Sequence, residues 1–214
     1  MKRTSLVFAV SALFLGCTSL HAGTILLSEN FNSATASLDV TSAGAFHTVG
    51  GTNVDIVSAP SGWASLIVAP ESANVVDLDG SGGNPQGVLK SNSAYELLPG
   101  VNYYLSFDLV GSQRGNTTST TVTFGNYDQT FNLASGDDTD GLVTNALVTV
   151  TTPTWSYLTF SSNTPGAMGA LLDNIEISSA TATPEPSTLL LLGSGFAMVA
   201  LLFARSRRKS LPTA

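Results

Sequence analysis

Carboxylates in two glycine-containing loops are the first residues of this sequence whose types and spacing suit chemistry. One loop reads Asp77-Leu78-Asp79-Gly80, and the other, Asp137-Asp138-Thr139-Asp140-Gly141, holds three carboxylates in four residues. Calcium takes six to eight oxygen ligands, which such loops can supply. However, neither loop completes the twelve-residue EF-hand pattern, and Asp and Gly are also the usual residues of plain turns. The sequence leaves both interpretations open and favours turns.

Aromatic residues with polar neighbours form a second candidate site, because sugar rings stack on exposed aromatic faces while polar groups bond their hydroxyls. The sequence predicts a glycan site drawn from Tyr104, Tyr127, Trp63 and Arg114. Tyr104 is a strong candidate because it lies opposite the apolar face of its strand. For the two tryptophans, Trp63 and Trp155, the stronger interpretation is burial in the core, since tryptophan is highly buried on average.

Catalytic machinery is sparse. His47 is the one histidine after residue 22, and no second imidazole lies near it to form a zinc site. No Gly-x-Ser-x-Gly motif introduces a serine nucleophile. Paired carboxylates can hydrolyse glycosides, but their separation decides this and the sequence does not give it. We therefore predict a protein that is not an enzyme, with a secreted glycoside hydrolase as an alternative.

Charge is distributed very unevenly along the 214 residues. Residues 23–183 contain two basic residues, Lys90 and Arg114, against fourteen acidic ones, a net charge of −12. The other basic residues lie near the two ends of the chain. A segment this acidic repels phosphate backbones, which excludes nucleic acid as a partner.

Short alternating runs separated by Gly, Asn, Asp, Ser and Pro dominate the same segment, and they predict strands. The clearest runs from Val101 to Leu109, and a second includes Val122 and Phe124. Further runs are Thr24–Phe31, Asn53–Val57, Trp63–Val68, Asn74–Leu78, Tyr127–Leu133, Ala146–Thr151, Trp155–Phe160 and Leu171–Ile177. About ten short strands predict an all-β fold of two packed antiparallel sheets, a β-sandwich. The predicted domain covers residues 23–180.

The N-terminal segment has the form of a secretory signal peptide covering residues 1–22. Lys2 and Arg3 precede an apolar run from Leu6 to Gly16, and Leu20-His21-Ala22 suits cleavage. A lipid on Cys17 is an alternative, because Phe14-Leu15-Gly16-Cys17 partly matches a lipobox. Cleavage after residue 22 would leave no cysteine, so packing, with or without bound ions, must stabilise the domain.

Three features follow one another at the C-terminus. A linker, residues 181–188, contains Pro184-Glu185-Pro186, an apolar segment of residues 189–204 predicts a transmembrane helix, and a basic tail of residues 205–214 includes Arg205, Arg207 and Arg208. The basic residues favour a cytoplasmic tail, which places the acidic domain on the periplasmic side of the inner membrane. Together these features resemble the PEP-CTERM sorting signal of Gram-negative bacteria. The resemblance implies recognition by an exosortase, removal of the tail and delivery to the cell surface or the extracellular polysaccharide.

The ends of the predicted domain resemble galactose-binding-like jelly rolls. The resemblance is carried by the opening Leu27-Ser28-Glu29-Asn30-Phe31 and the closing segment Leu171–Ile177. It implies that the first and last strands lie close together, with a structural calcium ion beside them. Glu29 and Asp173 are the calcium ligands that the resemblance implies.

These observations predict an exported, surface-sorted, non-catalytic jelly roll in the extracellular polysaccharide or biofilm matrix that binds glycans weakly. A purely structural or adhesive matrix protein without a ligand pocket is the alternative of a different class. The two differ in the position of the aromatic side chains, which a binding module groups on one exposed face.

Overall fold

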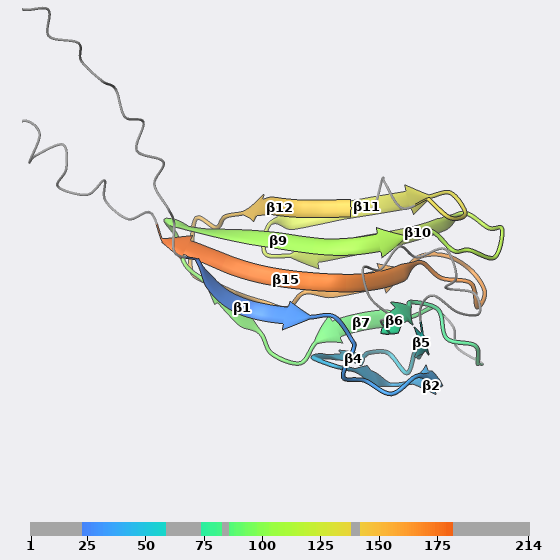
Figure 1. Ribbon diagram of the computed structural model, residues 1–214. Helices are drawn as coiled ribbons and strands as arrows, with labels where there is room; N and C mark the ends of the chain where they lie inside the picture. The colour runs from blue at the N-terminus through green and yellow to red at the C-terminus, as the bar shows by residue number, and fades with distance from the viewer. Residues whose placement is uncertain (1–22, 59–73, 83–85, 138–141, 182–214) are drawn as a thin grey trace, which may run out of the picture. The chain divides into compact units, whose positions relative to one another are not determined.

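The computed structural model describes residues 23–58, 74–82, 86–137 and 142–181, and all the regular structure in these residues is β. The larger sheet has the order β12-β9-β15-β6-β5-β2, and β1 also pairs with β15. Its strands are β1 (Thr24–Glu29), β2 (Ser37–Val40), β5 (Val54–Ser58), β6 (Asn74–Asp77), β9 (Val101–Val110), β12 (Leu142–Val148) and β15 (Leu171–Thr181). The long strands β9 and β15 run side by side along the middle of this sheet (Figure 1).

The smaller sheet has six strands in the order β11-β10-β14-β7-β4-β3. These are β3 (Ser42–Ala43), β4 (Phe46–Thr48), β7 (Val88–Ser91), β10 (Thr118–Phe124), β11 (Tyr127–Leu133) and β14 (Thr159–Ser162). A separate two-stranded sheet joins β8 (Tyr95–Leu97) to β13 (Thr154–Ser156). All the strand pairs in the three sheets are antiparallel, so the predicted all-β, antiparallel β-sandwich is confirmed.

The core lies between the two larger sheets and is filled by the inward side chains of alternating strands. In β9, Tyr103, Leu105, Phe107 and Leu109 are buried while the residues between them are partly exposed. Phe107 contacts Phe160 of β14 edge to face, with ring centroids 5.3 Å apart. Such aromatic pairs stabilise a core by about 0.5–1.5 kcal/mol beyond the area they bury.

The first and last strands are neighbours, as the sequence predicted. Thr24 of β1 lies opposite Ser179 of β15, and Glu29 lies opposite Ile175. The described chain therefore enters and leaves the domain at the same end of the larger sheet. Among the described residues there is no helix of the length and apolarity that a membrane span needs. The predicted signal peptide, linker, transmembrane helix and basic tail lie outside the described residues, apart from Thr181.

Candidate functional site

Glu29 and Asp173 both lie at the corner beside β1 and β15, where Glu29 is the pairing partner of Ile175. Glu29 ends β1, and its two carboxylate oxygens accept hydrogen bonds from the backbone amides of Phe31 and Ala45, both at 2.7 Å. Gly44 has a φ of +52°, and a Cβ there would collide with the Glu29 carboxylate, so glycine is required beside it. Glu29 therefore joins the end of β1 to the turn before β4.

Asp173 occupies an irregularity in the pairing of β15 with β9. Asn174, with a φ of +49°, donates from its backbone amide to Asp173 Oδ1 (2.8 Å) and from its side chain to Asp108 (2.7 Å). The pKa of Asp173 is raised to about 6, chiefly by burial and less by the Asp108 and Glu29 carboxylates, while the Asn174 amide lowers it. In the described parts of the chain, no three Asp, Glu, His or Cys side chains are grouped to hold a metal ion. Calcium at Glu29 and Asp173 stays a prediction.

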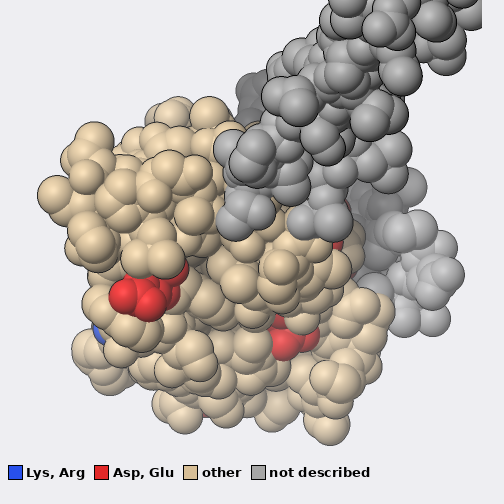
Figure 2. Space-filling model, turned by 90° about the vertical axis from the view of Figure 1, so that its left-hand side faces the viewer, with Lys and Arg blue, Asp and Glu red and all other residues tan. Residues whose placement is uncertain are grey.

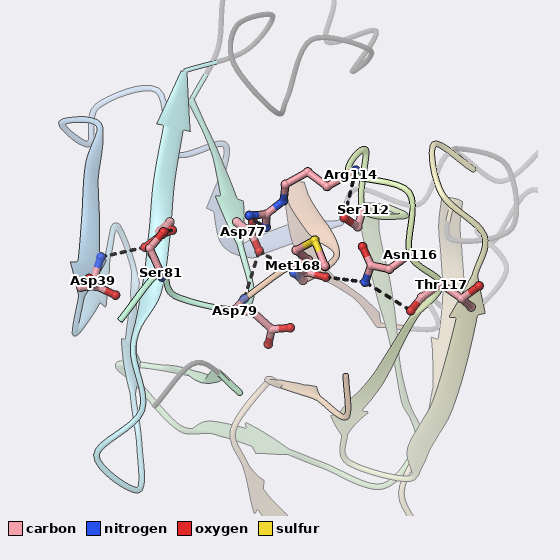
Figure 3. Close-up of polar contacts among 11 residues, drawn as sticks. Asp39, Asp77, Asp79, Ser81, Ser112, Arg114, Asn116, Thr117 and Met168 are labelled. Carbon is pink, nitrogen blue, oxygen red and sulfur yellow. Dashed lines mark hydrogen bonds and ion pairs between the residues drawn. The ribbon is translucent and has the colours of Figure 1, made fainter. Parts of the chain in front are cut away.

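A second polar cluster lies at the end of β6, where an ion pair joins Asp77 to Arg114 (Figure 3). Arg114 Nη2 donates to Asp77 Oδ2 at 2.5 Å, while Asp77 Oδ1 accepts from the backbone amides of Asp79 (3.1 Å) and Gly169 (3.0 Å). Asp77 is fully buried. Burial raises its pKa to about 7 even though Arg114 and the Asp79 amide lower it. This arrangement holds together β6 and the loops before β10 and β15.

Asp55 of β5 lies next to this ion pair and is also fully buried. It accepts hydrogen bonds from the backbone amides of Asp39 (2.7 Å) and Ser81 (3.2 Å) and from the Ser81 hydroxyl. Neither this buried carboxylate nor the ion pair was predicted from the sequence. One feature of the sequence could have indicated the buried carboxylate. Asp55 interrupts an otherwise apolar run, and both faces of that strand are buried.

The residues predicted to bind glycan do not form one group. Tyr104 faces outward on the larger sheet, beside Leu147 and Ser178. Tyr127 is half-buried against the core, and burial raises its pKa. Arg114 is engaged with buried Asp77, and Trp63 lies outside the described residues. Among the described residues, three of the four thus occupy three different regions.

Two exposed aromatic residues, Trp155 and Tyr157, lie two residues apart in and just after β13. We call these two residues and Lys90 the aromatic platform. Trp155 is 67% exposed, so the expectation that it fills the core is wrong. It lies in the small β8–β13 sheet, opposite exposed Glu96. Tyr157 is 40% exposed, and Lys90 Nζ lies 3.6 Å from its ring centroid, a cation–π contact.

Polar side chains continue from the platform across the outer face of the smaller sheet. Lys90 lies opposite His47 on one side and Thr159 on the other, and Thr159 lies opposite Thr123. Next to this row, Thr121 and Thr130 share a hydrogen bond of 2.9 Å between their hydroxyl oxygens. The outer face is thus a row of hydroxyl and amine groups beginning at two exposed aromatic rings.

Residues 182–209 match the model of the PEP-CTERM protein-sorting motif. The chain carries a PEP-CTERM sorting signal. The predicted sorting residues, Pro184, Glu185, Pro186, Arg205, Arg207 and Arg208, all lie within the matched range. PEP-CTERM signals mark exported proteins whose C-terminal membrane anchor is processed by an exosortase. No curated relative matches the sequence.

Solved β-sandwich domains share the arrangement of the chain at low sequence identity. The CBM22-1 xylan-binding domain of Paenibacillus barcinonensis Xyn10C is 16% identical, with a TM-score of 0.45 over 76% of this chain and 99% of that domain. The K3 cleaved adhesin domain of Lys-gingipain from Porphyromonas gingivalis is also 16% identical, with a TM-score of 0.40 over 73% of this chain and 98% of that domain. The GH26-CBM35 β-(1,4)-mannanase of Podospora anserina is 14% identical, with a TM-score of 0.36 over 75% of this chain and 28% of the enzyme.

Proposed function

We propose that this exported protein is a non-catalytic glycan-binding module of the extracellular polysaccharide matrix. In this proposal, a polysaccharide lies on the aromatic platform and along the outer face of the smaller sheet. The observation that carries the proposal is the exposure of Trp155 and Tyr157 two residues apart, with the Lys90 ammonium on the Tyr157 ring. Large aromatic side chains are mostly buried in folded proteins. Two exposed aromatic side chains on one short segment therefore indicate a contact surface.

Stacking on the two rings would supply most of the affinity, because an aromatic face buries the apolar C–H side of a sugar ring. The hydroxyls of Thr159 and Thr123 would then bond the sugar hydroxyls. The surface elsewhere favours uncharged ligands. Figure 2 shows one face of the domain, with isolated acidic patches on a largely uncharged surface. The net charge of −12 over residues 23–183 repels acidic polymers. A neutral polysaccharide is therefore the expected ligand.

Replacing Trp155 by Ala should weaken binding of neutral polysaccharides at least tenfold, because a stacked aromatic ring contributes more than about 1.4 kcal/mol. Affinity electrophoresis of the full chain in gels containing single polysaccharides measures this loss. Tyr104→Ala is the matched control, since it removes a partly exposed aromatic side chain from the other sheet. The proposed face would be contradicted if every polysaccharide gel that retards the unmodified chain also retarded the Trp155→Ala variant equally.

An adhesive matrix protein without a glycan pocket is a second candidate, favoured by an apolar strip on the larger sheet. The strip crosses four neighbouring strands. Exposed Leu147 of β12 lies opposite Tyr104 of β9, and Tyr104 also lies opposite Ser178 of β15. On its other side, Ser178 lies opposite exposed Ile25 of β1. In this case the strip would contact another protein. Retention on no polysaccharide, together with self-association that Leu147→Ser abolishes in sedimentation experiments, would favour this second function.

A further inference from the structure

Oxygen-bearing side chains face inward between the two larger sheets near the end of β6. Thr118 and Thr120 lie on the inner face of β10, and Thr120 is the direct partner of Ser162 in β14; all three are buried. The Ser162 backbone amide donates a hydrogen bond to the Gly87 carbonyl (2.9 Å). Asp79 forms an isolated β-bridge with Gln86, the residue before Gly87. We call Asp79, Thr118, Thr120 and Ser162 the interior oxygen cluster.

Most of the oxygens in this cluster lack a hydrogen bond. Both carboxylate oxygens of Asp79 and the hydroxyls of Thr118 and Thr120 are buried without a partner. The Ser162 hydroxyl and the Gly87 amide lie near enough to lower the pKa of Asp79, but neither makes a hydrogen bond of normal geometry with it. Folded proteins pair nearly all such buried groups, because an unpaired one costs the full free energy of its desolvation. Several together indicate a bound group.

The charge of the region indicates what that group is. Asp55, Asp77 and Asp79 are all fully buried, and Arg114 is the one basic side chain near them in the described residues. Arg114 pairs with Asp77, while Asp55 is satisfied by amide and hydroxyl donors. The Asp79 carboxylate therefore has no ion-pair partner of its own, and its two oxygens accept no hydrogen bond of normal geometry. Its surroundings offer hydroxyl oxygens, which bind cations.

We propose that the interior oxygen cluster binds one calcium ion, with the Asp79 carboxylate as its charged ligand and the hydroxyls of Thr118, Thr120 and Ser162 as neutral ligands. Carboxylate and neutral oxygens are the ligands that this hard cation prefers, and water can complete its coordination. The ion would join the loop after β6 to the inner faces of β10 and β14. This site is separate from the Glu29–Asp173 corner and independent of the proposed glycan-binding face.

Thermal unfolding of the full chain in detergent, with Ca²⁺ as the probe, tests the site. Calcium at 100 times its dissociation constant should raise the unfolding temperature by roughly 5–10 °C over the value in EGTA. Asp79→Asn should abolish this response. In EGTA the same variant should be more stable than the unmodified chain, because it removes an uncompensated buried charge. Thr120→Val, which keeps the shape of the side chain, should weaken calcium binding about tenfold in calorimetric titration.

The control variant is Asp173→Asn, which removes the buried carboxylate of the other predicted calcium corner. It should keep the full calcium response. If the calcium response is lost in Asp173→Asn and kept in Asp79→Asn, the proposal is overturned in favour of the Glu29–Asp173 corner. If the unmodified chain shows no calcium response, the proposal is also overturned, and the cluster holds buried water. If Asp79→Asn does not fold, the anomalous signal of crystals grown in calcium decides: a peak at Asp79 supports the site, and its absence overturns it.

Discussion

Replacing Arg114 by Met should lower the free energy of unfolding at pH 8 by about 3–5 kcal/mol, the usual cost of removing one partner from a buried ion pair. Asp77 would keep its burial and its two backbone donors but would lose its counterion. Methionine retains much of the apolar volume of the arginine stem, so lost packing contributes little. Urea unfolding of the full chain, followed by tryptophan fluorescence, measures the difference.

Two comparisons separate the ion pair from a general effect of losing charge. Lys90→Met removes the other basic side chain of residues 23–183 and should change stability by less than about 1 kcal/mol, since Lys90 is partly exposed. The double variant Asp77→Asn with Arg114→Met should recover part of the loss, because it leaves no unpaired charge. An Arg114→Met variant as stable as Lys90→Met would show that the ion pair contributes nothing.

The long strands of the sandwich were predictable from their alternating side chains, most clearly in β9, where one face is buried from Tyr103 to Leu109. Val101–Leu109 and Tyr127–Leu133 agree closely with β9 and β11. The short strands β3, β4 and β8 could not be found, since two or three residues carry too little alternation. The run Trp155–Phe160 was expected as one strand, but β13 and β14 divide it between two sheets.

The candidate sites depended on contacts between residues far apart in sequence, and alternation does not give these. Arg114 was expected to bind sugar, yet its partner is buried Asp77, 37 residues earlier. The predicted strand Asn74–Leu78 agrees with β6, but alternation did not show that the Asp77 carboxylate at its end is fully buried. Trp155 was expected inside the core, and only the two-stranded pairing with β8 shows why it is exposed. In contrast, the PEP-CTERM sorting motif at residues 182–209 was predictable, because its features are consecutive in sequence.

Stability should fall as the pH rises from about 4 to about 7, because three buried carboxyl groups bind protons more tightly in the folded protein. The pKa of Asp77 is raised to about 7 and those of Asp79 and Asp173 to about 6, in each case chiefly by burial. In the unfolded chain the pKa of these groups is about 3.9, the ordinary value for aspartate. Between these values the folded protein holds more protons than the unfolded chain, so raising the pH favours unfolding.

The expected difference in the free energy of unfolding between pH 5 and pH 8 is a few kcal/mol, since each unit of pKa difference corresponds to about 1.4 kcal/mol. Urea midpoints measured in EGTA at half-unit pH steps give the curve. Asp79→Asn should flatten it between pH 4 and 6 and raise its pH 8 end, because the amide has no charge to desolvate. The pH range of this change separates the contribution of Asp79 to the pH dependence from that of Asp77, which continues up to pH 7. A midpoint that climbs steadily from pH 5 to pH 8 would mean that these carboxylates are stabilised as anions in the folded protein.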